Sequence, residues 1–401
     1  MIIMRLLVKF IIFIACLALA FVVLILSFYF YEVHKDRKTD VVTTGKKIFS
    51  HTTFPMCKNK LMTILSIDGG GSRGIVPLYF LSKIESHTHQ SIRENFDIMS
   101  GVSVGGLLVA ALSIKNKNGS FLYSAKQLIQ MYQHFSDSLL KVSFHRNILS
   151  VNGFVSPKFS SYDKFEFLKK YIPMNLYLDD LSGNTIFFGT NAVNNALLTF
   201  CSWKNCFKPL QKYPLYTLIS GITSPFGYFS PQFFLKNDHK ISYILGDATY
   251  IIKDPTLQTY IISKNLCPNE KHYLLLSLGT GETPEHDLKT NAIFHWGTIK
   301  WIFHVFANMY YGGQDVTKQE LDMVSRSEKN AVIYIRINPK IPKKAYSPFV
   351  STPSDMRVLL SASNQYYLHH QAMFKCLFET LKTHRLKKNC EHILVSNPNT
   401  V

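Results

Sequence analysis

The chain opens with a long apolar segment and then changes to short apolar runs separated by glycine turns. Residues 10–31, FIIFIACLALAFVVLILSFYFY, carry no charge and match the roughly 20 residues that a membrane-spanning helix needs. The segment exceeds the roughly 7–15 apolar residues of a secretory signal peptide, so we expect an anchor, with a cleaved signal peptide as the alternative. Residues 1–9 form its flank. Residues 32–60 are polar and without periodicity, so we expect a tether there.

From residue 61 onward, apolar strands alternate with helices. The runs LMTILSID at 61–68 and FDIMSG at 96–101 are typical of buried strands, and a segment with helical spacing follows each of them. This alternation predicts an α/β fold, a three-layer sandwich around a central, mostly parallel sheet. We expect the domain to cover 61–340, with a helical C-terminal extension over 341–401. Four more strands are expected in the apolar runs at 184–192, 241–247, 273–281 and 331–339.

The charge balance narrows the class of partner. Lys and Arg number 44 against 26 Asp and Glu, which gives a formal net charge of +18. Such an excess suits an anionic membrane surface or a nucleic acid. No nucleic-acid recognition motif stands in the sequence, and the apolar segment favours a membrane. More Lys and Arg follow the apolar segment than precede it, which favours a cytoplasmic position for the domain.

Seven cysteines are scattered along the chain, and Cys16 lies inside the apolar segment. Cys201 and Cys206 form the one close pair, without a second pair or a histidine cluster at zinc spacing. We therefore expect ordinary buried thiols and no metal site. The redox compartment stays open at this point.

A glycine-rich turn follows the first strand of the domain. In TILSIDGGGSRGI, Gly69, Gly71 and Gly74 fit the spacing of a dinucleotide-binding loop. Such a loop needs an acidic residue at the end of the second strand, about 20 residues further on, and a P-loop needs a lysine that is absent here. The second strand leads instead into Gly101–Gly105, GVSVG. The dinucleotide interpretation is therefore disfavoured.

The GVSVG segment has the setting of a nucleophile elbow. It follows an apolar strand and opens directly into an apolar helix, so Ser103 would be exposed at a sharp turn. The alternative is a serine that packs at a helix start. A glycine-rich turn beside a nucleophile can bring backbone N–H groups close to a tetrahedral oxyanion. We therefore expect Gly69, Gly70 and Gly71 to donate to an oxyanion hole.

These motifs resemble those of the patatin-like phospholipases. DGGGSRGI from Asp68 and FDIMSGVSVGGLLVAAL from Phe96 look like the two leading motifs of that family. The resemblance continues through SPFGYFSP from Ser224, LLLSLGTG from Leu274, and a long helix followed by YIRINP. It covers residues 61–364, roughly three quarters of the chain.

The resemblance implies a Ser–Asp dyad with Ser103 as nucleophile and Asp247 as base, without cofactor or metal. The family places glycine and a second small residue after the aspartate, whereas this chain has Ala248 and Thr249. If position 248 requires a positive φ, alanine costs roughly 1 kcal/mol or more, which would lower activity. Arg73, in the glycine turn, is expected to contact a phosphate or to form a structural salt bridge.

The function that this resemblance implies is hydrolysis of glycerophospholipid esters by a membrane-tethered enzyme, with phospholipid as partner and no nucleic acid. One alternative is an α/β-hydrolase that uses Ser, Asp and His in that order. His272, His295 and His392 follow Asp247 in the sequence. The other alternative is a weakly active protein of the same fold that binds acidic membranes.

Overall fold

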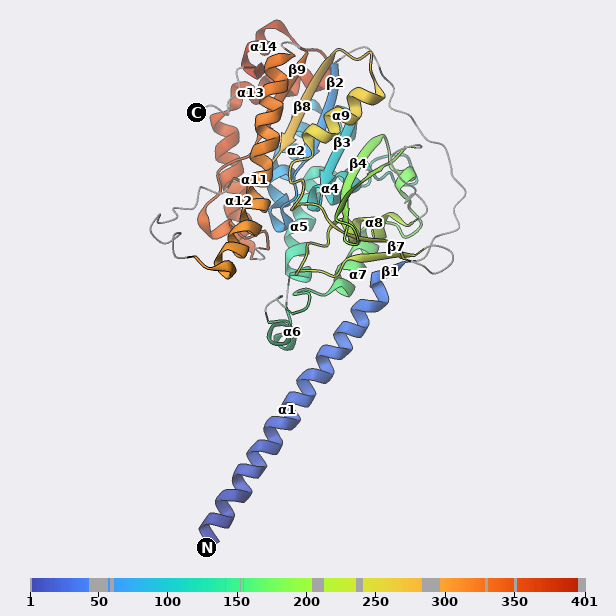
Figure 1. Ribbon diagram of the computed structural model, residues 1–401. Coiled ribbons are helices and arrows are strands. Elements are labelled where there is room, and N and C mark those ends of the chain that lie inside the picture. The colour runs from blue at the N-terminus through green and yellow to red at the C-terminus, as the bar shows by residue number, and fades with distance from the viewer. Residues whose placement is uncertain are drawn as a thin grey trace.

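The structure is a computed structural model that describes residues 2–42, 57, 61–140, 142–151, 153, 155–203, 213–235, 241–282, 296–328, 331–349 and 352–395. Figure 1 shows a long helix, α1 (Ile2–Asp40), that projects from an α/β body. The sheet of that body lies between two layers of helices. The three-layer α/β architecture expected from the sequence is confirmed.

Parallel strands form the centre of the sheet. They are β4 (Asn184–Asn191), β3 (Ile98–Val102), β2 (Leu61–Ile67), β8 (His272–Leu278) and β9 (Val332–Ile337), in that spatial order. Beyond β4 lies β7 (Ile241–Asp247), antiparallel to β4, and then β6 (Gln232–Leu235), antiparallel to β7. β1 (Val41–Val42) pairs with β6 in parallel. β5 (Ala196–Cys201) pairs with β4. The six expected strands are present, and β1, β5 and β6 are additional.

Alternate residues of β2 enter two hydrophobic cores, one on each face of the sheet. Leu65 and Ile67 face the first core, and Met62 and Ile64 face the second. The first core is covered by α2 (Ile75–Thr88), α4 (Val104–Ser113), α5 (Ala125–Leu139), α8 (Leu215–Ile222), α12 (Pro353–His369), α13 (Gln371–Thr383) and α14 (Lys388–Val395). The second is covered by α9 (Thr256–Leu266) and α11 (Thr298–Ser327). The short helices α3 (Ile92–Asn95) and α6 (Phe144–Leu149) and the longer α7 (Ser161–Tyr171) complete the body.

The expected tether is helical over its first part. Helix α1 runs without interruption to Asp40, so residues 32–40 continue the apolar helix. Ion pairs with the body hold this end: Arg146 Nη2 lies 2.6 Å from Asp36 Oδ2, and Arg146 Nε lies 2.8 Å from Glu32 Oε2. The interpretation of 32–40 as an irregular tether is therefore wrong. Residues 43–56 and 58–60 lie outside the described part of the chain.

The C-terminal helices belong to the main core. The ring of Phe374 on α13 stacks on that of Phe80 on α2, with 5.6 Å between centroids and 8° between planes. Leu359 and Leu377 are fully buried in the same core. Within the described residues 352–395, helices α12, α13 and α14 cover the sheet together with α2.

The expectation of free buried thiols is wrong. Cys57 is bonded to Cys267, and Cys376 is bonded to Cys390. Cys201 is also disulfide-bonded, whereas Cys206 lies outside the described residues. The pairing of Cys57 with Cys267 could not be read from the sequence, because the two residues are 210 positions apart.

Candidate active site

Ser103 occupies the sharp turn between β3 and α4. Its backbone has φ 54° and ψ −124°, a conformation that is rare for a residue with a side chain and that is characteristic of a nucleophile elbow. The backbone around Ser103 packs closely against the end of β2 and against itself. A β-carbon at Gly105 would lie 2.2 Å from the Ile67 carbonyl oxygen, and one at Gly101 would lie 2.2 Å from the Gly105 carbonyl carbon. The spacing of glycines around Ser103 therefore follows from packing.

Asp247 ends β7 on the neighbouring part of the sheet. It is paired with Gly189 of β4, and β4 in turn pairs with β3, which carries the elbow. Its Oδ1 accepts hydrogen bonds from the backbone N–H of Thr249 at 2.8 Å and from the Thr249 hydroxyl at 2.6 Å. These two donors fix the carboxylate, which is 1% exposed.

The structure brings Ser103 and Asp247 together directly. Both side chains line the same cavity, and Ser103 lies close enough to Asp247 for its hydroxyl to lower the pKa of that carboxyl. Burial raises the pKa of Asp247 above its ordinary value, and the Ser103 hydroxyl and the hydrogen bonds from Thr249 oppose this rise only in part. A carboxylate with a raised pKa is a stronger proton acceptor than an exposed aspartate. The pair can therefore transfer a proton without a histidine between the two residues.

The glycine turn presents fewer donors than expected. The N–H of Gly69 donates to the Lys253 carbonyl at 3.2 Å, so it is not available to an oxyanion, and the expectation for this residue is wrong. Gly69 is instead required by space, because a β-carbon there would lie 2.2 Å from Thr249 Oγ1. Gly70 and Gly71 line the same cavity as Ser103. Gly71 has φ +56°, which favours glycine.

A buried charge cluster of Arg336, Asp68 and Asp254 adjoins the glycine turn. Arg336 on β9 donates from Nη1 and Nη2 to the two oxygens of Asp68, each at 2.7 Å. The same Nη1 lies 3.0 Å from Asp254 Oδ2. Two carboxylates share one guanidinium in a fully buried place, and desolvation raises the pKa of Asp68 to about 6. Since Asp68 directly precedes Gly69, this cluster fixes the start of the turn.

Arg73 does not reach the cavity. Its side chain is fully buried, and Nη2 donates to the Tyr310 hydroxyl at 2.7 Å. Its Nε and Nη1 are buried without a hydrogen-bond partner in the described structure. Tyr310 lines the cavity and Arg73 does not. Neither expected role of Arg73 is therefore supported: its observed contact is with Tyr310, and no ion pair of Arg73 is found among the described residues.

Ser103 and Asp247 open onto an apolar cavity of about 250 Å³. Its walls come from the elbow, from α5, α7 and α11, and from the segments that follow α8 and η4 (Lys343–Ala345). The apolar and aromatic residues that line it are Val104, Leu107, Leu139, Leu140, Leu168, Pro225, Tyr228, Phe229, Tyr250, Tyr310, Pro348 and Phe349. Such walls can accommodate an acyl chain.

Lys164 is a cavity residue that the sequence did not reveal. It lies on α7 and is 3% exposed. Its Nζ donates to the Ser220 carbonyl at 2.8 Å and to Ser224 Oγ at 2.5 Å. The positive charge of Lys164 lowers the pKa of Asp247 and so opposes the effect of burial. A lysine on an amphipathic helix ordinarily indicates a solvated face, and no local signal distinguishes this one.

None of the histidines that the structure describes lines this cavity. His272 begins β8 and is exposed, and His392 lies on α14. His295 lies outside the described residues. Within the described ranges, no group of three or more His, Cys, Asp or Glu side chains could hold a metal ion.

The alanine after Asp247 is not strained. Ala248 is absent from the residues with positive φ in the described chain, and its side chain is fully buried in the core beside α9. The expectation of strain at this position is therefore wrong. Thr249, the second departure from the family pattern, contributes two of the hydrogen bonds that hold Asp247.

The comparisons agree with this geometry. A family model described as patatin-like phospholipase matches residues 65–235, which include the glycine turn and the elbow. This region is a patatin-like phospholipase domain, and the curated relatives support the same family. The domain and these relatives support a lipid acyl hydrolase enzyme.

The similar curated proteins are plant patatins. The chain is 24% identical to patatin group D-3 of Solanum tuberosum over 302 residues, which cover 69% of this chain and 76% of the relative. It is 26% identical to patatin-like protein 4 of Arabidopsis thaliana over 296 residues, with 68% and 71% covered. Patatin-like protein 2 of Oryza sativa subsp. indica is 29% identical over 273 residues, with 61% and 67% covered.

Proposed function

We propose that this patatin-like protein is a membrane-anchored phospholipase that hydrolyses carboxylic esters of glycerophospholipids. Ser103 is the nucleophile and Asp247 is the base. The observation that carries the proposal is the placement of these two buried side chains, with Ser103 at a sharp strand-to-helix turn, on one apolar cavity. Their separate origins, on the β3 elbow and at the end of β7, make a chance pairing of this kind uncommon.

Acylation begins with attack of Ser103 Oγ on the ester carbonyl carbon. The Ser103 proton passes to Asp247, whose raised pKa makes it a competent acceptor. The carbonyl oxygen becomes an oxyanion, and the N–H groups of Gly70 and Gly71 are the proposed donors to it. The N-terminus of α4 directly follows Ser103 and also favours negative charge there.

Collapse of the tetrahedral intermediate breaks the ester bond. The leaving lysolipid oxygen takes the proton back from Asp247, and the acyl group stays on Ser103. A water molecule then attacks the acyl-serine while Asp247 accepts its proton, and the fatty acid leaves when Ser103 regains a proton. Every proton in this cycle passes through one carboxylate.

The N-terminal helix is the proposed membrane anchor. Within the described residues, Lys9–Arg37 is the one helix that is long and apolar enough to cross a membrane by length and composition. The 22 apolar residues of 10–31 span about 33 Å as a helix, close to the roughly 30 Å of a bilayer core. The Tyr29 hydroxyl donates to Ser156 Oγ at 2.6 Å. Contacts of this kind favour a retained helix over a cleaved signal peptide, since cleavage after the segment would remove Tyr29.

Hydrolysis of mixed phospholipid vesicles tests the proposed chemistry. The purified full chain should release fatty acid and lysolipid, and Ser103→Ala should abolish the release without a change in thermal unfolding. Hydrolysis that survives Ser103→Ala would refute the assignment. Extraction of the full chain from membranes by alkaline carbonate would refute the anchor and leave the chemistry untouched.

A further inference from the structure

Disulfide bonds brace two distant parts of the body. Cys57, which precedes β2, is bonded to Cys267 at the end of α9, and Cys376 on α13 is bonded to Cys390 on α14. With Cys201 also disulfide-bonded, every cysteine that the structure describes in the body is oxidised. The free cysteine among the described residues is Cys16, inside the apolar part of α1.

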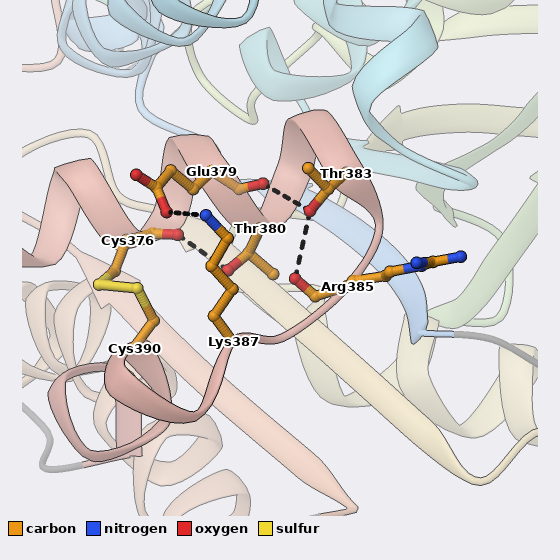
Figure 2. The surroundings of a disulfide bond; sticks show 7 residues. All are labelled: Cys376, Glu379, Thr380, Thr383, Arg385, Lys387 and Cys390. Atoms are coloured by element: carbon orange, nitrogen blue, oxygen red, sulfur yellow. Dashed lines mark hydrogen bonds and ion pairs between the residues drawn. A yellow bond between two sulfur atoms is a disulfide. The ribbon is translucent and has the colours of Figure 1, made fainter.

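The disulfide between α13 and α14 belongs to a built structural element. Figure 2 shows that the bond between Cys376 and Cys390 closes the turn between the two helices. An ion pair of 2.9 Å between Lys387 Nζ and Glu379 Oε2 crosses the same turn, and the Thr383 hydroxyl donates to the Arg385 carbonyl at 3.3 Å. Cys376 and Cys390 are 5% and 2% exposed. Buried, braced cysteines of this kind are structural and not catalytic.

These disulfides indicate on which side of the membrane the body lies. Disulfide bonds form and persist in oxidising compartments, whereas cytosolic reductants keep thiols reduced. None of the bonded cysteines lines the active-site cavity, so a transient catalytic bond does not explain them. Several structural disulfides in one body therefore place that body in an oxidising compartment.

The charges that flank α1 gave the opposite expectation, a cytoplasmic body. That rule counts Lys and Arg in short loops, and long folded domains translocate largely regardless of their charge. The body after α1 exceeds 300 residues, well above the roughly 60 residues for which the rule holds. The disulfides therefore outweigh the flanking charge.

The surface of the body carries one acceptor sequence for N-linked glycan. Asn118-Gly119-Ser120 is the one Asn-x-Ser/Thr in the chain. It lies in a tight turn between α4 and α5, where the Asn116 N–H donates to the Ser120 carbonyl at 2.8 Å. Asn118 is exposed, and a β-carbon built at Gly119 would have no atom within 4 Å. A bulky glycan can therefore be accommodated here without displacing the fold.

We infer that the body lies on the lumenal or extracellular side of the membrane and that Asn118 carries an N-linked glycan. The transfer joins Nδ2 of Asn118 to the anomeric carbon of a lipid-diphosphate-linked oligosaccharide. It releases the lipid diphosphate and one amide proton. The inference rests on the apolar segment only as the signal for translocation, and its readout does not use ester hydrolysis.

Expression of the full chain in cultured animal cells, followed by digestion with peptide N-glycosidase, tests the glycan. The wild type and Ser120→Thr, which keeps the acceptor sequence, should each lose the mass of one glycan on digestion. Asn118→Gln and Ser120→Ala should migrate at the digested position without treatment. An undigestible wild-type band would overturn the assignment of Asn118.

Thiol labelling of the same protein tests the compartment independently. Lysates are denatured in a maleimide reagent without reductant, and labelled cysteines are identified by peptide mass. Cys16 should be labelled, and Cys57, Cys267, Cys376 and Cys390 should be labelled only after reduction. Labelling of these four without reductant would overturn the oxidising location, whatever the hydrolytic activity of the preparation.

Discussion

Replacement of Asp247 by asparagine separates proton transfer from structure. The amide keeps an oxygen for the two Thr249 donors, at 2.8 and 2.6 Å in the wild type. It cannot accept the proton of Ser103. Loss of a general base in a comparable hydrolytic site lowers kcat by about 10³–10⁴-fold, and we expect a fall of that size on phospholipid vesicles, measured by fatty-acid release.

The Asp247→Asn variant should lose activity without losing stability against unfolding. Burial raises the pKa of Asp247 in the folded protein, so the folded state disfavours the ionised form. The stability associated with the protonated carboxyl is present at low pH and is lost as pH rises through the folded pKa. Asp247→Asn should therefore be at least as stable as the wild type at neutral pH, by thermal unfolding.

The pH profile supplies the control. Wild-type kcat should fall as pH drops through the raised pKa of Asp247, because only the carboxylate accepts a proton. Thr249→Val removes the hydroxyl donor and should raise that pKa further, which moves the acid limb of the profile to higher pH. An Asp247→Asn variant with kcat within tenfold of the wild type would refute the reasoning, since the base would then be another group.

Three further predictions concern other parts of the chain. Arg336→Met leaves two buried carboxylates unpaired and should lower the unfolding free energy by about 3–5 kcal/mol in denaturant titration, with exposed Arg385→Met as a near-neutral control. Ala248→Gly should leave kcat unchanged and cost about 0.5–1 kcal/mol of stability. A clear gain in turnover would contradict this and would indicate backbone strain at Ala248 in the wild type. Phe144 on α6, which contacts α1, and Val155, next to the Ser156 that Tyr29 contacts, are 71% and 73% exposed. Replacing both by serine should slow hydrolysis of vesicles several-fold but leave a soluble short-chain ester unaffected; equal losses on both substrates would argue against contact with lipid.

The sequence predicted the parts of the site that depend on local pattern. The sharp turn at Ser103 was predictable because an apolar strand, a glycine-flanked serine and an apolar helix are contiguous. The six strands were predictable because each is a continuous apolar run. β6 has only four residues, too few to show a period, and β5 continues from β4 through a turn that carries no strong signal. The role expected for Asp247 came from family resemblance, since a lone aspartate after a strand is not specific.

The sequence could not predict features that arise from contacts between distant segments. The amide of Gly69 is used by the Lys253 carbonyl, and nothing in a glycine-rich turn indicates which of its amides is already bonded. The burial of the Lys164 ammonium group depends on the Ser220 carbonyl, on a different helix, which accepts a hydrogen bond from it. Cysteine pairing likewise depends on which segments meet in the folded chain.

The anchor and the cavity are joined by a continuous set of contacts, which gives the proposed anchor a role beyond attachment. Arg146, held by Asp36 of α1, donates from Nη1 to the Phe159 carbonyl at 3.0 Å. The Phe159 ring contacts that of Phe349, with 5.5 Å between centroids, and Phe349 stacks on Tyr228 at 3.9 Å. Phe349 and Tyr228 both line the cavity.

A helix fixed in this way would hold the cavity at a constant height above the bilayer. Phe28 contacts His145 with 5.7 Å between ring centroids, about 4.5 Å along the helix from the end of the apolar segment at Tyr31. The α6 region of the body should therefore lie at the level of the lipid headgroups. Arg146→Met would release this joint and leave Ser103 and Asp247 intact. We expect slower hydrolysis of vesicles with an unchanged rate on a soluble ester, and equal rates on vesicles for wild type and variant would show that a flexible attachment is sufficient.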